Sequence, residues 1–135
     1  MIFDQKYFTK FNFPQAQVEQ FLSSAVRNLN IATEDKILEV KFNYAYRAFI
    51  KSGIALLAFS KHKLKRLPGH HVKLIEAMSE ILTDQNIDLL GNLMRSKRNL
   101  DLYAGTWEIT EKECKEYLSF SESVLARVKK IVQLR

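Results

Sequence analysis

The chain has 135 residues and a formal net charge of +6, with 47% hydrophobic and 27% charged residues. This length and composition predict one soluble globular domain over residues 1–135, and the excess of Lys and Arg favours polyanionic partners mildly. No run of about 18 apolar residues is present, and the N-terminus lacks the pattern of a signal peptide, so no membrane segment is expected. The single Cys114 excludes an internal disulfide, and we expect a cytoplasmic protein.

Apolar residues recur at spacings of three and four along nearly the whole chain, which is typical of helices. In the first half this pattern predicts helices over residues 14–30 and 34–61, with Pro14 in the first turn and Thr33 as an N-cap. The second of these helices contains Gly53 in its middle, at a cost of about 1 kcal/mol relative to Ala. We expect a close crossing with another helix to be the reason for that glycine.

The second half of the chain predicts three more helices. Pro68 and Gly69 mark a turn before the first of them. Thr110 and Glu113 have the spacing of a capping box, which predicts the start of the last helix. The three helices are expected over residues 70–82, 86–99 and 110–133. The predicted fold is therefore all-α, an up-and-down bundle of about five helices.

A polar stretch, LMRSKRNLDLYAGTW, joins the predicted fourth helix to the loop after it. At roughly 100° per residue, Arg98 falls at the edge of the apolar stripe of that helix. A guanidinium at a core boundary needs acceptors, because an unpaired buried charge is costly. Arg98 therefore either pairs with Asp101 or Glu80 and fastens the helix end, or holds a phosphate or carboxylate of a ligand. The predicted stripe consists of Ile87, Leu90, Leu93 and Met94.

A second basic stretch, SKHKLKRLPGHH, has two interpretations. It is either a patch that contacts phosphates or a helix C-terminus at which cations suit the helix dipole. Its histidines, His62, His70 and His71, do not predict a metal site, because adjacent histidines are expected to point apart and no Cys or paired acid has zinc spacing. No cofactor fingerprint is present. The cations of this stretch are Lys61, Lys63, Lys65 and Arg66.

The end of the predicted fourth helix also resembles a known family. The segment RSKRNLDLYAGTWEITEKE, with PGHHVKLIEAMSEIL before it, is similar to the HEPN superfamily of small helical bundles. The motif of that family is an Arg, usually followed by a polar residue, and a His four to six residues after the Arg. Arg98 matches the Arg and Asn99 the polar residue, whereas Tyr103 stands at the position of the His. The resemblance implies a two-fold dimer that brings both copies of the motif into one cleft.

The resemblance further implies a protein that binds RNA or nucleotide phosphate. Arg98 would grip the phosphate, Asn99 would orient it, and Arg95 and Lys97 would add positive potential. For a member that cleaves RNA, the implied reaction is metal-independent transesterification. Tyr103 is a poor base for that reaction, since the ordinary tyrosine pKa is near 10.

Two other interpretations of the chain stay open. It is either a non-catalytic interaction module, such as the partner of a nucleotidyltransferase-type protein in a toxin–antitoxin-like pair, or an unrelated bundle in which Arg98 forms a structural salt bridge. Ile37 and Tyr44 lie away from the main stripe of their helix, which is the sequence feature that supports a homodimer surface.

Overall fold

A computed structural model describes residues 3–104 and 109–133, with their side chains except those of residues 101–104. This part of the chain contains five helices and one two-stranded sheet, so the predicted all-α bundle is confirmed. None of the described helices is long and apolar enough to cross a membrane. In chain order the elements are β1 (Phe8–Lys10), α1 (Gln15–Glu34), α2 (Leu38–Phe59), β2 (His62–Leu64), α3 (His70–Ile81), α4 (Gln85–Ala104) and α5 (Glu111–Gln133).

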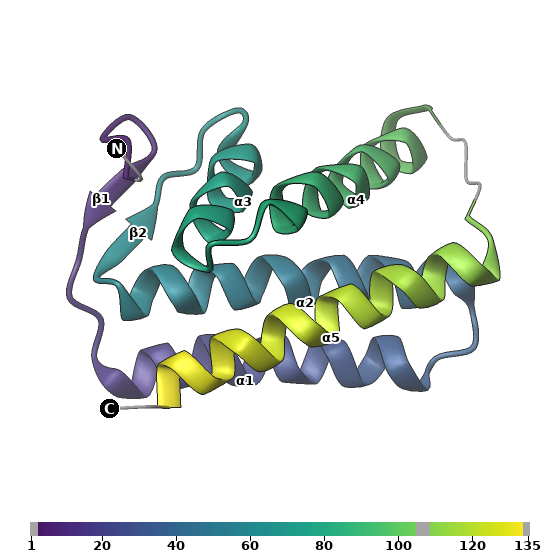
Figure 1. The fold of residues 1–135 in the computed structure, drawn as a ribbon, viewed down its shortest axis with the longest axis horizontal. Coiled ribbons are helices and arrows are strands. Elements are labelled where there is room, and N and C mark those ends of the chain that lie inside the picture. The colour runs from purple at the N-terminus through teal and green to yellow at the C-terminus, as the bar shows by residue number, and fades with distance from the viewer. Residues whose placement is uncertain (1–2, 105–108, 134–135) are drawn as a thin grey trace.

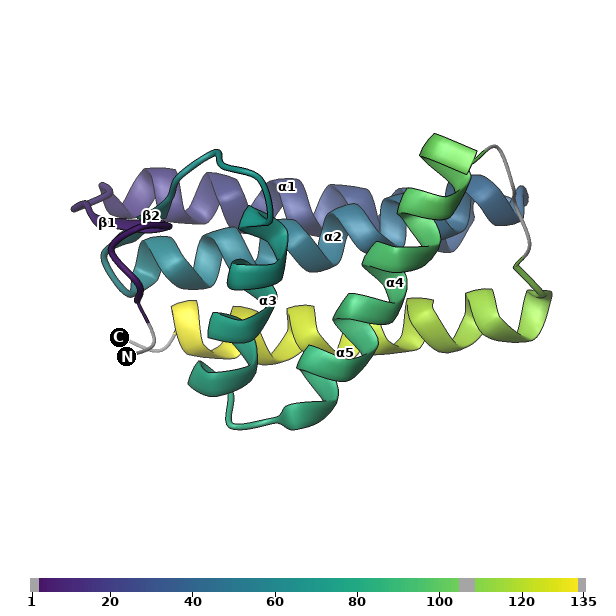
Figure 2. The ribbon, with the colours of Figure 1, turned by 90° about the horizontal axis from the view of Figure 1, so that it is seen from above.

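The helices form two layers (Figure 1). In one layer α1, α2 and α5 run along the length of the molecule, and in the other α3 and α4 cover one side of α2. Figure 2 shows that α3 and α4 cross the three long helices obliquely instead of running parallel to them. The β1–β2 pair lies beside α3, at the end of the bundle where α2 finishes.

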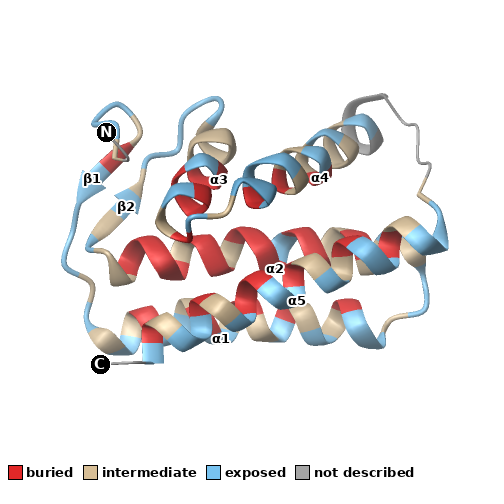
Figure 3. Ribbon diagram, viewed as in Figure 1, coloured by how far each residue is buried: buried red, intermediate tan, exposed pale blue. Residues whose placement is uncertain are grey.

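The central helix of the bundle is α2. It contacts each of the other four helices and is buried along almost its whole length (Figure 3). Burial of apolar surface at about 25 cal/mol per Å² makes this helix the main source of stability for the fold. Its largest fully buried side chains are Phe42, Tyr46, Phe49, Leu56 and Leu57.

Two glycines allow α3 and α4 to approach α2 closely. A Cβ atom added at Gly53 of α2 would collide with Sδ of Met78 on α3. A Cβ atom added at Gly91 of α4 would lie 2.7 Å from Cζ of Phe49 on α2, far inside normal contact distance. The close crossing predicted from Gly53 is therefore confirmed, and Gly91 makes a second one.

The connection between α1 and α2 differs from the prediction. α1 continues through Thr33, whose hydroxyl donates to the Leu29 carbonyl (2.9 Å), so Thr33 is not the cap of the next helix. The N-cap of α2 is Ile37, which has no side-chain cap, and Asp35 Oδ1 accepts the N–H of Ile37 (2.9 Å) and so fastens the turn before the helix.

The helix predicted over residues 34–61 ends two residues earlier than expected. α2 ends at Phe59, and Lys61 adopts a left-handed conformation with φ of 64° that the helix cannot accommodate. The next three residues form β2, which pairs antiparallel with β1. Of the four cations, Lys61 therefore lies at the C-terminus of α2, Lys63 lies on β2, and Lys65 and Arg66 lie on the loop after it.

The predicted start of α5 is confirmed. Thr110 Oγ1 accepts the N–H of Glu113 (3.0 Å), and Glu113 Oε1 accepts the N–H of Thr110 (3.1 Å), as in a capping box. The turn between α3 and α4 is fastened to α5 by Arg127, whose guanidinium donates to Asp84 Oδ2 and to the Leu82 carbonyl, both at 2.7 Å.

Candidate functional site

α4 places Arg98 in line with its buried face. Ile87, Gly91 and Met94 are buried, and Arg98 occupies the next position of the same stripe, four residues further on. Leu93, which the sequence assigned to the core, is 45% exposed. The buried face of α4 is therefore rotated relative to the prediction, and Arg98 lies at the centre of the stripe instead of its edge.

The Arg98 guanidinium covers the ring of Tyr46, a buried residue of α2. The guanidinium carbon lies 5.5 Å from the ring centroid, within the range of a cation–π contact. No carboxylate whose side chain the structure describes forms an ion pair with Arg98, so the predicted pairing with Glu80 is not found. The side chain of Asp101, the other predicted partner, lies outside the described residues.

Tyr46 connects Arg98 to a histidine at the start of α3. Its hydroxyl lies 3.1 Å from His71 Nδ1. Burial raises the pKa of Tyr46 to about 12 against the opposing charges of Arg98 and Arg95, so the hydroxyl keeps its proton at neutral pH. Burial, together with the charges of His70 and the same two arginines, lowers the pKa of His71 to about 4, so the imidazole is neutral. Two neutral tautomers fit this contact: the hydroxyl donates to Nδ1 when the ring proton is on Nε2, and Nδ1–H donates to the hydroxyl oxygen when the proton is on Nδ1.

His70 lies beside His71 and carries a ring proton on Nδ1. Its Nδ1 is 2.8 Å from the Leu67 carbonyl, and since a carbonyl only accepts, Nδ1 carries the proton and Nε2 is an acceptor in the neutral ring. The two ring centroids are 4.4 Å apart, so the expectation that these histidines point apart is wrong. Gly69, with φ of 79°, redirects the chain into the first turn of α3 and so brings both rings to one place. Among the described residues, no group of three or more His, Cys, Asp or Glu is placed to hold a metal ion.

These side chains line a cavity of about 700 Å³ between the loop before α3, the first turn of α3 and the last turns of α4. We call it the basic cavity. Its described wall contains no carboxylate, and the positive end of the α3 dipole adds to the charge of the side chains. It joins the two polar stretches that the sequence presents separately. The polar side chains of its wall are Arg66, His70, His71, Arg95, Arg98 and Asn99.

The lysines that the sequence assigned to the same site lie elsewhere. Lys97 forms an ion pair with Glu113 of α5 (3.3 Å), where it helps to lower the pKa of that carboxyl beyond the effect of the Thr110 backbone N–H. Lys65 Nζ donates to the backbone carbonyl of Gln5 (2.9 Å).

Lys61 and Lys63 each line a different hollow. Lys61 lies on the wall of a groove near the start of α1. Lys63 lies on the wall of a second cavity, which His70 and His71 separate from the basic cavity.

The described site differs in membership from the predicted one. Arg98, Asn99, Arg95 and Arg66 come together, whereas the side chain of Tyr103 lies outside the described residues. Tyr46, interpreted from the sequence as core, is buried as expected but also carries a polar contact to His71. The sequence signal for this contact was a hydroxyl-bearing ring within the buried stripe of α2, with a His-His pair directly after a Pro-Gly turn.

Comparison of the chain with protein-family models, with curated proteins and with solved structures gave no match. The functional argument therefore depends on the residues of this chain.

The neutral state of His71 predicts a pH-dependent stability. Because its folded pKa of about 4 lies below the ordinary value of 6.5, the unfolded chain binds more protons between these two values. The free energy of unfolding therefore falls as the pH drops from 6.5 towards 4, by on the order of 1 to 2 kcal/mol once solvent screening at this half-buried ring is included. Urea unfolding at pH 7 and pH 5 should show a smaller loss for His71→Asn than for wild type.

The matched control is His62→Asn, which removes an imidazole on β2 that is not among the groups acting on His71 and should keep the wild-type difference between the two pH values. An unchanged pH dependence in His71→Asn would contradict the assignment of a neutral, buried His71.

Proposed function

We propose that this chain is a HEPN-like protein that binds the phosphate groups of RNA or of a nucleotide in the basic cavity. The observation that carries the proposal is the convergence of three arginines and two histidines on a cavity whose described wall has no carboxylate. Like charges held together raise the energy of the folded chain, and a bound anion removes that penalty. The sequence resemblance supports the same ligand class, because Arg98 and Asn99 stand at its motif positions.

The hydrogen-bond donors of the cavity suit a phosphate. The guanidinium of Arg98 is planar and offers two parallel N–H groups, which can donate to two phosphate oxygens at once. Arg95 is oriented by its Nε–H, which donates to Asn92 Oδ1 (3.2 Å) and leaves the terminal nitrogens for a ligand. In the tautomer that carries its proton on Nε2, the neutral ring of His71 adds a donor to the cavity without gaining a proton.

Removing the Arg98 guanidinium should weaken binding of single-stranded RNA. A charged hydrogen-bond pair contributes about 1.5 to 3 kcal/mol, so Arg98→Ala should raise the Kd of a 5′-phosphorylated oligoribonucleotide about tenfold or more. The Kd of Arg98→Lys should lie between those of wild type and Arg98→Ala, since lysine keeps the charge but cannot donate two parallel hydrogen bonds. Fluorescence anisotropy at low and moderate salt measures both the Kd and its salt dependence.

Two further variants make this measurement specific. Lys129→Ala removes the same charge from an exposed position of α5 and should leave the Kd within about twofold of wild type. Arg95→Ala tests the cavity independently if Arg98→Ala loses thermal stability through exposure of Tyr46. If all three alanine variants had the same Kd, the affinity would depend only on the total positive charge and not on the position of the cation. That result would overturn the proposal.

A second candidate function is metal-independent cleavage of bound RNA, and the geometry of His70 favours it. Its Nδ1–H is fixed on the Leu67 carbonyl, which leaves Nε2 free to accept a proton. In this reaction Nε2 takes the proton of a 2′-hydroxyl, the 2′-oxygen bonds to phosphorus, and the bond to the 5′-oxygen breaks as that oxygen takes a proton from solvent. Arg98 and Arg95 would stabilise the extra negative charge.

Cleavage by this route should depend on His70 and not on Tyr103. A positioned general base contributes about 10²- to 10⁴-fold, so His70→Gln should slow cleavage of a transfer RNA in excess chelator by at least about 100-fold. Tyr103→Phe should retain activity. Loss of cleavage in Tyr103→Phe with wild-type cleavage in His70→Gln would exclude His70 as the base. Cleavage by a folded Arg98→Ala at the wild-type rate would exclude the basic cavity as the site of reaction. Absence of cleavage by a folded wild type would exclude the reaction and leave a binding protein.

A homodimer is the partner arrangement that the exposed surface of α4 supports. Leu89, Leu93 and Leu100 are 60%, 45% and 57% exposed and lie on one face of the helix, with Ser96 between them and no charged residue on that stripe. Burying them against a second copy would remove apolar surface from water without bringing the positive charges of two chains into direct contact. We call this surface the leucine stripe.

Breaking the leucine stripe should shift the chain to a monomer. Light scattering should give twice the monomer mass for wild type and the monomer mass for Leu93→Glu. Ile37→Glu, at an apolar residue that is 61% exposed on the other layer, should remain dimeric. A monomeric wild type would overturn the homodimer and leave the interaction with a nucleotidyltransferase-type protein, which the sequence resemblance suggests, as the alternative to test.

A further inference from the structure

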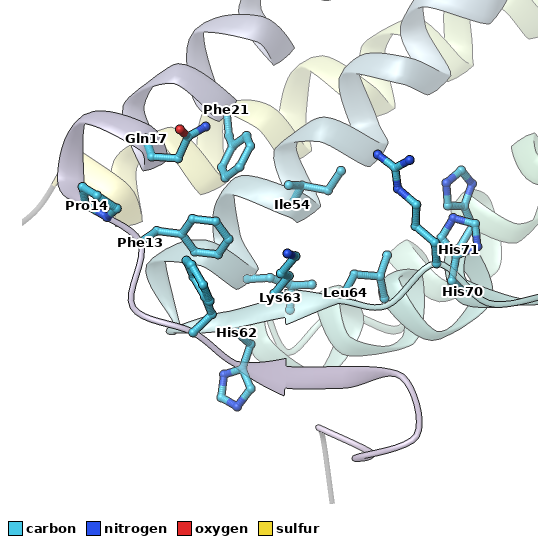
Figure 4. Close-up of a pocket in the computed structure, with 13 residues that line it drawn as sticks. Phe13, Pro14, Gln17, Phe21, Ile54, His62, Lys63, Leu64, His70 and His71 are labelled. Atoms are coloured by element: carbon cyan, nitrogen blue, oxygen red, sulfur yellow. The ribbon is translucent and has the colours of Figure 1, made fainter.

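A second cavity, of about 740 Å³, adjoins the basic cavity on the side of the β1–β2 pair. We call it the aromatic cavity. Figure 4 shows the rings of Phe13 and Phe21 towards one end of it and His70 and His71 towards the other, with Ile54 and Leu64 between them. Arg66, His70 and His71 line both cavities, so the two hollows are neighbours that share one cationic wall.

The rings of the aromatic cavity are held in place by one another. Phe13 packs edge-on against Phe21, with centroids 5.4 Å apart and planes at 80°, and lies 4.5 Å from Phe11. Phe11 is 46% exposed, and Lys63 Nζ lies 5.5 Å from its ring centroid. Solvent-exposed aromatic rings next to a cavity are typical of a surface that binds a ligand.

The charge on this wall restricts the kind of ligand. The ionisable side chains that line the hollow are all basic: His62, Lys63, Arg66, His70 and His71. No carboxylate of the described residues lines it. An apolar ligand without charge would leave this cationic edge unpaired, whereas a simple anion would leave the aromatic walls uncovered. The site therefore fits a ligand that carries a flat apolar group next to an anionic one.

We propose that the aromatic cavity holds the base of a nucleotide whose phosphate lies in the basic cavity. This inference rests on the proposed phosphate binding and adds the base as the second recognised group. A base stacks on phenylalanine faces whatever its identity, because every base has a flat π-face. The amide of Gln17 also lines the cavity and can donate to and accept from the edge of a base, which an acyl chain cannot match.

The experiment is calorimetric titration with three probes: adenosine 5′-monophosphate, ribose 5-phosphate and octyl phosphate. Wild type should bind the nucleotide about tenfold more tightly than ribose 5-phosphate, since stacking and edge contacts of the base are lost in the sugar phosphate. Phe13→Leu keeps an apolar side chain but removes the ring face, so it should abolish this difference and leave ribose 5-phosphate binding unchanged. Phe120→Leu makes the same change on α5, outside both cavities, and should behave as wild type.

Gln17→Ala provides a second variant if Phe13→Leu lowers thermal stability, and it should weaken only nucleotide binding. Equal affinity for the nucleotide and for ribose 5-phosphate overturns the base site but keeps the phosphate site. Tighter binding of octyl phosphate than of the nucleotide overturns the base in favour of an acyl chain. Failure of all three probes to bind, or binding that Arg98→Ala leaves unchanged, overturns the phosphate site and the base site together.

Discussion

The close approach of α3 and α4 to α2 is the constraint on which the site depends. Gly53 and Gly91 remove the two Cβ atoms that would hold the helices apart. Only at that separation does Arg98 of α4 lie over the ring of Tyr46, while the hydroxyl of the same ring reaches His71 of α3. One buried tyrosine thus positions a cation from one helix and a neutral imidazole from another, and the packing of the core determines the geometry of a polar surface.

The same contact explains the electrostatic state of the cavity. Arg98 and Arg95 lie close enough to help keep His71 neutral, so adding one more positive charge to this wall is unfavourable. A bound phosphate would reverse the sign of the local field and favour the imidazolium, which would add a charge-assisted hydrogen bond to the anion. Under the proposed function, proton uptake at His71 and phosphate binding would therefore be linked, and each would strengthen the other.

The sequence predicted the helices well and the site in part, for physical reasons that differ between elements. The long amphipathic patterns and the Thr110–Glu113 capping box depend on neighbours within a few residues, and both were visible. The sequence did not predict β2, because its partner β1 lies far from it in the chain. A strand of three residues is also too short to show the alternation of apolar and polar residues that is typical of strands. The joining of Arg66 with Arg98 could not be predicted, since it depends on how α3 and α4 cross α2.

The rotation of α4 has a consequence for how the chain compares with the HEPN arrangement. Because Arg98 continues the buried stripe of α4, it lies on the opposite side of this helix from Leu89 and Leu93. A dimer built on the leucine stripe would therefore leave the two basic cavities facing away from the interface, one in each copy. Each cavity takes its histidines from α3 of its own chain, so the donors that surround a phosphate are complete without a second copy. The proposed self-association and the proposed phosphate binding would thus use opposite faces of one helix, and a change on the stripe would alter the first while leaving the second intact.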